Sequence, residues 1–320
     1  MQSNILETVR REQSRRLAEK SRHSFATFTQ CAWPYLEQGT PLSWSWHHDA
    51  ICDHLEALYR GQIKKLVISL PPRHTKSTLV SVAFPAWAWI NAPSERFLTT
   101  SYRVDLAIRD AERSRGLMET EWYQEYFHSS FAFSSSQNVK SFYRNDHGGT
   151  RIATSVEGGA TGEGGSWVVC DDPHSIMDVT SPTKRERVHV WWDSVMGNRL
   201  NDQQTGRMVI VAQRSHKFDL IGHVLAQGGY EYLMLPAEFD PSRKTFTSIG
   251  WSDPRTEPGQ PLWEEKFPRS VLDARKSAMG LDYLAQFQQA PVSEEGNIIR
   301  PAHMHGYHLL FPNMESTHKN

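Results

Sequence analysis

The residues best suited to chemistry in this sequence are a lysine and a serine at the end of a short basic turn. Residues 65–78 read Lys-Leu-Val-Ile-Ser-Leu-Pro-Pro-Arg-His-Thr-Lys-Ser-Thr, so an apolar run leads into Lys76 and Ser77. A loop between a strand and a helix N-terminus directs several backbone N–H groups at one point, where the helix dipole also favours an anion. A lysine at the end of such a loop reaches the β- and γ-phosphates of a nucleoside triphosphate, and the hydroxyl that follows binds Mg²⁺.

This loop lacks the glycines that are usual in phosphate-binding loops. Aligned on Lys76, Leu70 and Thr75 stand where glycines are expected. Glycine permits backbone angles that other residues avoid and lets a phosphate approach closely. Pro71 and Pro72 could hold the loop open through their rigidity instead. Taken alone, the segment is equally consistent with a phosphate site and with a basic surface turn.

Two adjacent carboxylates follow a second apolar run. Trp167–Cys170 leads directly into Asp171 and Asp172, and 95 positions separate Lys76 from Asp171. A carboxylate at the end of a neighbouring strand can hold Mg²⁺ through water, and a second one can orient or deprotonate the attacking water. Two acids before a proline are also a common turn signal. The order of loop lysine, apolar strand and double acid favours the phosphate site.

A third apolar run, Val209–Ala212, ends in Gln213 and Arg214. Polar residues at the carboxyl end of a strand in an open α/β sheet face the crevice where ligands bind. Gln213 and Arg214 could therefore sense the γ-phosphate. Without the other two segments, a polar pair that merely ends a strand would be the simpler interpretation.

Hydrophobic patterning predicts strands that alternate with helices, which favours an α/β fold with a mainly parallel sheet and helices on both faces. The expected strands are 66–70, 97–102, 151–155, 167–170, 208–212 and 232–235. The expected helices are 47–60, 77–91 with a kink at Pro85, 105–119, 183–200, 220–226 and 271–289, with an exposed helix or arm over 1–24. Residues 134–149, 158–165 and 236–270 are expected to form loops.

Composition excludes several classes of protein. The 320 residues carry a formal net charge of −1, so any nucleic-acid contact must come from a local basic surface. The three cysteines match no metal-binding spacing and favour a reduced cytosolic protein. No run of about 18 apolar residues is present, so we expect no membrane span, and the charged first 25 residues predict no signal peptide.

The sequence resembles the large terminase subunit of tailed bacteriophages, the ATPase that drives viral DNA into an empty capsid. The resemblance extends over about residues 30–300 and includes Leu70–His74 with Lys76-Ser77, a loop that in this family often lacks one or both glycines. The other matching segments are Trp46-His47, Asp49–Ile51, Pro85–Trp87, Gly148-Gly149 with Arg151, Thr161–Gly165, Asp171–His174, Trp191–Asp193, Gln213-Arg214, Leu235–Ala237 and Gln286–Gln289.

The resemblance implies a P-loop NTPase domain of the additional-strand type that binds ATP and Mg²⁺. Lys76 would contact the phosphates, Ser77 and Asp171 the magnesium, and Asp172 would be the catalytic carboxylate. Arg73 could contact the γ-phosphate in cis, although a finger arginine from a neighbouring subunit is an equal alternative. His47 would lie near the adenine. The remaining expected nucleotide-binding residues are Pro72, His74, Thr75, Thr78 and Gln213.

The resemblance also implies partners and a domain plan. The partners would be double-stranded DNA, the portal protein and the small terminase subunit. The chain would form a homo-oligomeric ring in the cytoplasm of the infected bacterium and transiently at the portal. We expect a helical arm over 1–40, the ATPase domain over 41–290, and a tail over 291–320 where the family's nuclease domain would begin.

Because few residues follow the ATPase region, we expect no nuclease activity from this chain. Two alternatives stay open at this stage. One is a helicase-like ATPase that acts on other DNA. The other is a non-hydrolysing DNA- or capsid-binding relic in which the altered loop no longer binds ATP.

Overall fold

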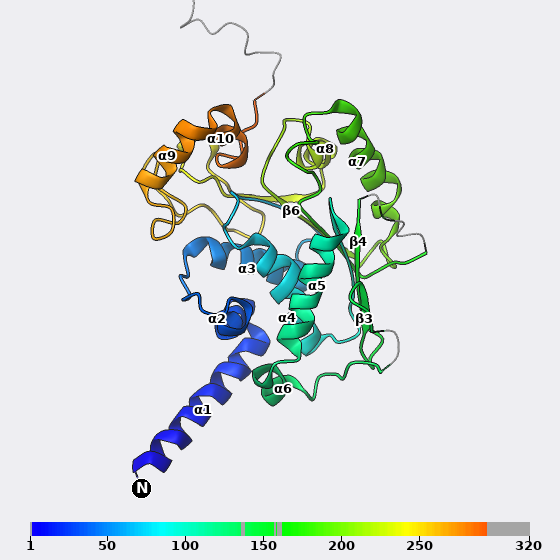
Figure 1. The fold of residues 1–320 in the computed structure, drawn as a ribbon, viewed down its shortest axis with the longest axis vertical. Coiled ribbons are helices and arrows are strands. Elements are labelled where there is room, and N and C mark those ends of the chain that lie inside the picture. The colour runs from blue at the N-terminus through cyan, green and yellow to red at the C-terminus, as the bar shows by residue number, and fades with distance from the viewer. Residues whose placement is uncertain (1, 136–137, 157, 159–161, 293–320) are drawn as a thin grey trace, which may run out of the picture.

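A seven-stranded sheet organises the computed structural model, which describes residues 2–135, 138–156, 158 and 162–292 (Figure 1). The strand order is β3-β4-β2-β5-β6-β1-β7, and neighbours are parallel except for the β3–β4 pair. The strands are β1 (Lys65–Ser69), β2 (Arg96–Ser101), β3 (Phe142–Arg144), β4 (Thr150–Ser155), β5 (Trp167–Asp171), β6 (Arg207–Ala212) and β7 (Glu231–Met234).

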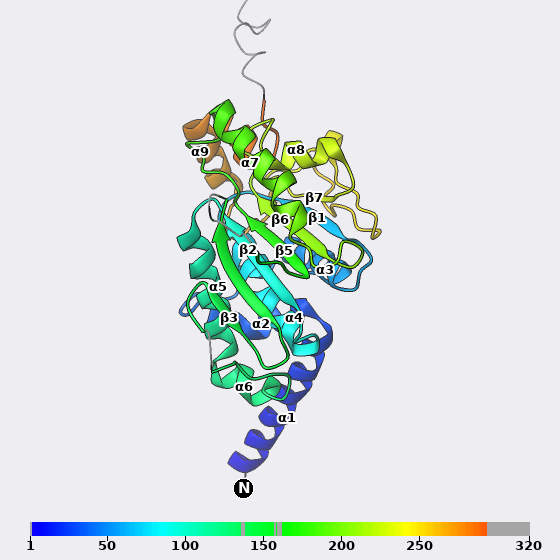
Figure 2. The same cartoon turned by 90° about the vertical axis from the view of Figure 1, so that its right-hand side faces the viewer.

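Helices cover both faces of this sheet (Figure 2). Alternate residues of a strand point to opposite faces, so Leu66 and Ile68 join the core under α2–α6, whereas Val67 joins the core under α7 and α8. The helices are α1 (Gln2–His23), α2 (Phe25–Leu36), α3 (Trp46–Tyr59), α4 (Phe84–Asn91), α5 (Val104–Met118), α6 (Glu121–Phe127), α7 (Pro182–Ser194), α8 (Leu220–Gln227), α9 (Arg269–Met279) and α10 (Leu281–Gln286), with short helical segments at Thr78–Ala83, Met196–Asn198 and Pro241–Arg243.

The predicted α/β fold is confirmed, including the additional strand. β6 lies between β1, which precedes the lysine loop, and β5, which precedes the two acids. All six predicted strands are present with ends shifted by at most one residue. The loop prediction for 134–149 was wrong in part, because β3 forms there and pairs antiparallel with β4 through a turn. Helix α6 was not predicted, whereas α2 lies within the helical arm predicted over 1–40.

The strand register brings the predicted site together. Ser69 at the end of β1 pairs with Ala212 of β6, and Asp171 at the end of β5 pairs with Val211. Parallel strands present their carboxyl ends at one edge of a sheet. The segments that follow β1, β5 and β6 therefore start side by side.

The helix after the lysine loop begins at Lys76 and continues as a π-helical segment, Thr78–Ala83, before α4. Pro85, predicted as a kink, lies at the second position of α4. Proline has no N–H, so it leaves the carbonyl of Ser81 without its usual helical donor. Arg151 of β4 supplies one instead, with its Nη2 2.7 Å from that oxygen.

The N-terminal region consists of two helices with different surroundings. α1 extends away from the body of the molecule (Figure 1). α2 packs into the core under α3–α6 through Phe25 and Phe28, although it falls within the predicted arm of 1–40. None of the described helices is both long enough and apolar enough to span a bilayer. In the predicted tail of 291–320, the residues after Val292 lie outside the part of the chain that the structure describes.

Candidate functional site

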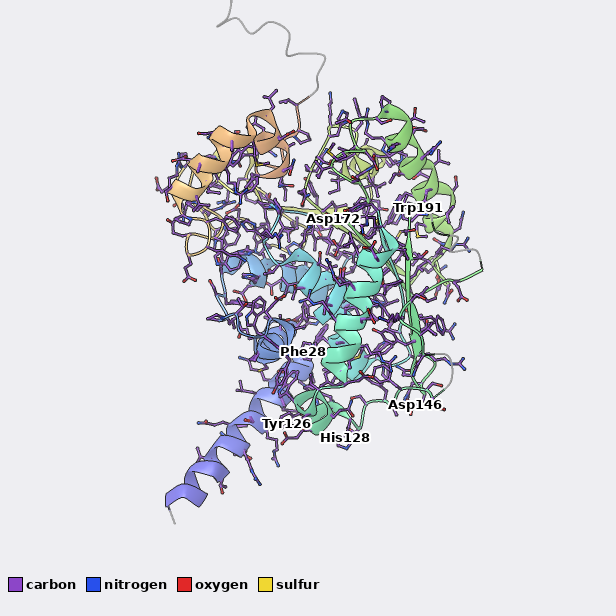
Figure 3. The ribbon with its side chains drawn as sticks, viewed as in Figure 1. Phe28, Tyr126, His128, Asp146, Asp172 and Trp191 are labelled. Atoms are coloured by element: carbon purple, nitrogen blue, oxygen red, sulfur yellow. The ribbon has the colours of Figure 1, made fainter. Side chains whose placement is uncertain are left out.

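A cavity of about 790 Å³ opens where β1, β5 and β6 end. Figure 3 shows the labelled Asp172 near the N-terminal end of α5. Eight of the predicted site residues line the cavity: Pro72, Arg73, Thr75, Lys76, Ser77, Thr78, Asp172 and Gln213. The other lining residues are Trp33, Leu36, Glu37, Gln38, Thr40, Tyr102, Leu106, Arg109, Arg113, His174, Ile176 and Lys266.

The cavity wall is strongly cationic. Five of its side chains are arginine or lysine and two are carboxylates, an excess of three positive charges, although the chain as a whole is nearly neutral. Each carboxylate is already paired: Asp172 with Lys76 at 2.8 Å and Glu37 with Arg113 at 2.6 Å. A concave site of this charge suits a polyanion such as a triphosphate.

The lysine loop adopts backbone conformations that glycine would normally supply. Arg73 and Thr75 have φ angles of 66° and 61°, and Asp172 has a φ of 48°. This left-handed region is uncommon for residues with a Cβ and is an outlier for a β-branched one. Each such residue costs about 1–3 kcal/mol. The loop therefore keeps the shape expected of glycines by storing strain at the residues that line the cavity.

Contacts beneath the loop hold it in this shape. His74 turns away from the cavity, donates from Nδ1 to the carbonyl of Pro72 at 3.0 Å, and stacks on Phe267 with ring centres 4.4 Å apart. Lys266 donates from Nζ to the carbonyl of Arg73 at 3.3 Å. The side chain of His74, predicted to bind nucleotide, thus fixes the loop from behind.

His47, predicted near the adenine, is buried below the loop and does not line the cavity. Its ring centre lies 5.7 Å from that of His74 and 5.0 Å from that of Trp263. Burial, together with the neighbouring His48 and His74, lowers the pKa of His47, so the ring is neutral at pH 7. The structure thus gives His47 a place in the packing under the loop, and its contact with a base stays a prediction.

Lys76 and Asp172 face each other across the cavity floor. Lys76 is at the start of the helix, and Asp172 follows β5, so their ion pair joins the two segments. Burial alone would lower the pKa of Lys76, but the carboxylates of Asp172 and Asp171 outweigh it and raise the pKa. The lysine is therefore a fixed positive charge at the base of the loop.

Asp171, the predicted magnesium ligand, lies behind Asp172 and is 6% exposed. Its Oδ2 accepts a 2.7 Å hydrogen bond from the hydroxyl of Ser81, and its Oδ1 has no hydrogen-bond partner among the described residues. Burial, followed by the charge of Asp172, raises the pKa of Asp171 to about 7. Of the two acids, Asp172 is the one that lines the cavity.

Gln213 and Arg214, the pair that ends β6, separate into two roles. Gln213 lines the cavity, and its buried Oε1 has no partner among the described residues. Arg214 is instead tied to Asp219 at 3.0 Å, beside the start of α8. Only the first of the pair is therefore available to a ligand in the cavity.

Sequence reasoning missed one wall of the cavity, which comes from α5 and the end of α2. Arg109 and Arg113 of α5 line it together with Glu37, which accepts hydrogen bonds from Arg113 and from the hydroxyl of Thr78. The four-residue spacing of the two arginines was a signal for one helix face. Nothing in the sequence placed that face beside the loop.

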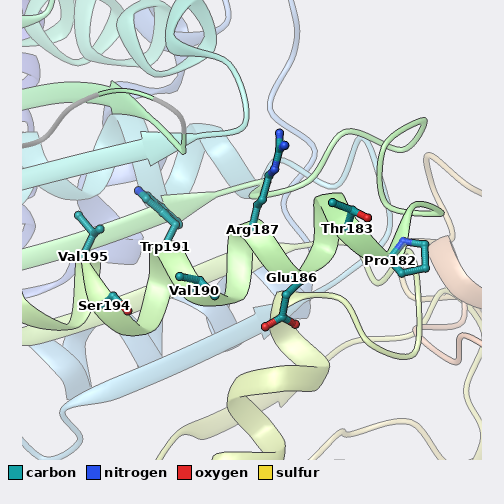
Figure 4. A pocket seen from close by; sticks show the side chains of 8 residues that line it. All are labelled: Pro182, Thr183, Glu186, Arg187, Val190, Trp191, Ser194 and Val195. Carbon is teal, nitrogen blue, oxygen red and sulfur yellow. The ribbon is translucent and has the colours of Figure 1, made fainter.

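A second hollow, of about 680 Å³, lies along α7 and contains no predicted site residue (Figure 4). Arg187 and Trp191 point to the same side of the helix there. Arg185, in the basic run 184–187, is buried and donates to the carbonyls of Val179 and Thr180. Arg185 therefore helps to hold the turn before α7 in place.

Solved structures similar to this chain include two phage large terminases, whereas no family model and no curated protein matches it. The bacteriophage HK97 large terminase shares 12% identity and a TM-score of 0.48, over 78% of this chain and 51% of that one. A large terminase from a thermophilic bacteriophage shares 6% identity and a TM-score of 0.44, over 73% of this chain and 51% of that one. This chain thus spans about half the length of either structure.

Proposed function

We propose that the chain is a Mg²⁺-dependent ATPase whose active site is the cavity at the ends of β1, β5 and β6. The observation that carries the proposal is the ion pair of Lys76 with Asp172, set in a loop–helix junction and surrounded by an excess of cations. A strand, a loop with a terminal lysine and a helix start form the phosphate-binding arrangement. The acid at the end of a nearby strand completes the set needed for hydrolysis.

The residues present fit a magnesium ion. Ser77 lines the cavity, and the buried Oδ1 of Asp171 lacks a partner among the described residues. Mg²⁺ prefers oxygen ligands and usually keeps several waters beside one or two carboxylates and substrate phosphates. Ser77 would hold the ion directly and Asp171 through water. When bound, the ion would neutralise charge on the phosphate oxygens.

The protein side chains would divide the work of hydrolysis. Lys76 would exchange Asp172 for phosphate oxygens when the nucleotide binds. Asp172, released from the ion pair, would orient the water that attacks the γ-phosphorus, so that ADP and inorganic phosphate are the products. Arg73 and Gln213, both in the cavity wall, are the predicted contacts for the γ-phosphate. The strained backbone at Thr75 and Asp172 fits a preorganised site.

Coupling of this ATPase to DNA packaging is the wider proposal. It follows the resemblance of the loop and acid segments to phage large terminases. On this proposal the chain moves double-stranded DNA as one subunit of a ring at a portal protein, with a small terminase subunit as a further partner. DNA stimulation of ATP turnover is the property that separates a packaging motor from a stand-alone ATPase.

Phosphate release from Mg²⁺-ATP, measured with and without double-stranded DNA, tests both levels of the proposal. The wild type should turn over ATP, whereas Lys76→Ala and Asp172→Asn should each lose at least about 100-fold in kcat. Arg96→Ala, a change of an exposed arginine outside the cavity wall, is the matched control and should retain the wild-type rate. Absence of Mg²⁺-dependent turnover in the wild type would contradict the ATPase and favour a non-hydrolysing relic. Turnover that survives in Lys76→Ala would contradict the site.

A further inference from the structure

Two arginines of α5 point into the same space as Lys76. Arg109 and Arg113 are four residues apart and share a helix side with Leu106, and all three line the cavity. The opposite side of α5, with Asp110 and Ala111, is buried in the core. α5 also packs directly against the helical segment that follows the loop. The two guanidinium groups thus form a second cationic wall.

A buried carboxylate fixes the orientation of Arg109. Its Nε and Nη2 donate to the two oxygens of Asp110 at 2.9 and 3.1 Å, and Asp110 is 3% exposed. A two-point contact of this kind holds a guanidinium in one plane. The contact with Asp110 leaves Nη1 of Arg109 to donate to a ligand, and the Arg109 side chain as a whole is 53% exposed.

The two arginines lie toward different parts of the site. The pKa of Arg109 is raised by its hydrogen bonds to Asp110 and also by the charge of Asp171, the acid at the end of β5. Arg113 instead shares Glu37 with Thr78, one residue past Ser77. α5 starts two residues after Tyr102, whose N–H donates to the carbonyl of Asp172 at 3.0 Å. Arg109, one turn nearer to that start than Arg113, is therefore on the side of the two acids, and Arg113 is beside the start of the helix that follows the loop.

We propose that Arg109 binds the γ-phosphate and thereby distinguishes a nucleoside triphosphate from a diphosphate. The assignment rests on the proposed ATPase function. A planar guanidinium held by Asp110 would donate from Nη1 to a γ-phosphate oxygen, where it would also stabilise the charge spread over the equatorial oxygens of the phosphoryl group in the transition state. ADP lacks that phosphate, so Arg109 contributes nothing to its binding.

Calorimetric titration with Mg²⁺-ADP and with the Mg²⁺ complex of the non-hydrolysable β,γ-imido analogue of ATP tests this directly. Arg109→Ala should weaken binding of the analogue by roughly 10- to 100-fold, leave ADP binding within about twofold, and lower kcat by about 100-fold. Arg109→Lys keeps the positive charge but cannot make the two-point contact of a guanidinium with Asp110. It should recover most of the analogue affinity but little of kcat.

Arg103→Ala is the matched control. Arg103 makes the same two-point contact with Asp105 at 2.9 and 2.6 Å and has a similar side-chain exposure of 60%, but it does not line the cavity. It should bind both nucleotides as the wild type does. An unchanged ratio of analogue to ADP affinity in both Arg109 variants, with a wild type that binds both, would overturn the role of Arg109 alone. Failure of the wild type to bind either nucleotide would overturn the proposed function first.

Discussion

The segments that follow β1 and β5 meet at one cavity, and both contain left-handed residues that are not glycine, yet they are held in different ways. After β5, backbone hydrogen bonds fix Asp172: its N–H donates to Val211 at 2.9 Å, and its carbonyl accepts from Tyr102 at 3.0 Å. After β1, the turn at Arg73 and Thr75 is held largely by side chains beneath it, above all the stacked rings of His74 and Phe267.

This difference predicts where each segment is vulnerable. Sheet hydrogen bonds form along with the strands themselves, so the acid segment is fixed by the fold. The lysine loop depends on a side-chain cluster contributed by the start of α3 and by residues 263–267, far away in the sequence. On the proposed function, changes in that cluster should therefore affect nucleotide binding without touching the cavity, whereas comparable changes elsewhere in the core should affect stability alone.

Phe267→Ala is expected to have the largest effect. Phe267 is 9% exposed, and truncating a buried phenylalanine costs about 3 kcal/mol or more in unfolding free energy. Loss of the ring under His74 should also weaken ATP binding by more than about tenfold, because the loop loses its support. Urea unfolding and nucleotide titration measure the two effects.

Phe131→Ala is the matched control for this change, since Phe131 is 6% exposed and packs on Trp89, away from the loop. It should lose similar stability and keep wild-type nucleotide affinity. Equal nucleotide affinities in the two variants would show that packing beneath the loop does not shape the site.

A pH dependence of stability should come from the same cluster. Burial lowers the pKa of His48 to about 4 and that of His74 to about 3, against about 6.5 in the unfolded chain. Between these values the unfolded state binds protons that the folded state does not. The free energy of unfolding is therefore unaffected by these histidines above about pH 6.5. Below that pH it falls by up to about 1.4 kcal/mol per pH unit for each histidine.

Unfolding free energy measured from pH 7 to pH 4.5 tests this prediction. His48→Gln should reduce the slope, because glutamine can accept the hydrogen bond that the N–H of Ser45 now donates to His48 Nδ1 but does not titrate. His128→Gln, at an exposed position, should leave the slope unchanged. Equal slopes in both variants would contradict the assignment.

Ser81→Ala should have a smaller effect, and on the acid segment only. It removes the hydroxyl that donates to Asp171 at 2.7 Å and leaves that buried carboxylate short of a donor, at a cost of about 1–3 kcal/mol. Thr99→Val removes a hydroxyl that donates to the Ile152 carbonyl at 3.1 Å and is the control for a neutral acceptor. A stability loss in Thr99→Val as large as in Ser81→Ala would show that a hydroxyl bonded to the Asp171 carboxylate stabilises the fold no more than one bonded to a neutral carbonyl.

The parts of the fold and site that could be predicted are those encoded within single segments. Parallel strands buried on both faces are continuous apolar runs, so their positions and the residues at their ends are visible in the sequence. Lys76, Asp172 and Gln213 each directly follow such a run or its loop, and all three line the cavity. Knowing that three strand ends lie together was enough to group them.

The rest depends on contacts between distant segments. α2 contains Pro34 and two threonines and is buried along much of its length, so it shows no clear amphipathic pattern. Glu37 and Arg113 meet only because α2 and α5 pack side by side. The left-handed turn was hidden for a different reason: Arg73 and Thr75 disfavour it, and it persists because of contacts beneath the loop, among them the ring of Phe267 and the hydrogen bond from Lys266, which come from distant residues.

The smallest expected effect concerns that strain directly. At ordinary helical positions glycine is about 1 kcal/mol less stable than alanine. At position 75, where φ is 61°, the Cβ of alanine is itself unfavourable, so Thr75→Gly should be more stable than Thr75→Ala by about 1 kcal/mol. The same pair of changes at Ser77, where φ is −68°, should give the usual order. Chemical denaturation of the four variants measures both differences. The usual order at both positions would mean that the loop relaxes in solution, and the contrast with the hydrogen-bonded segment after β5 would then disappear.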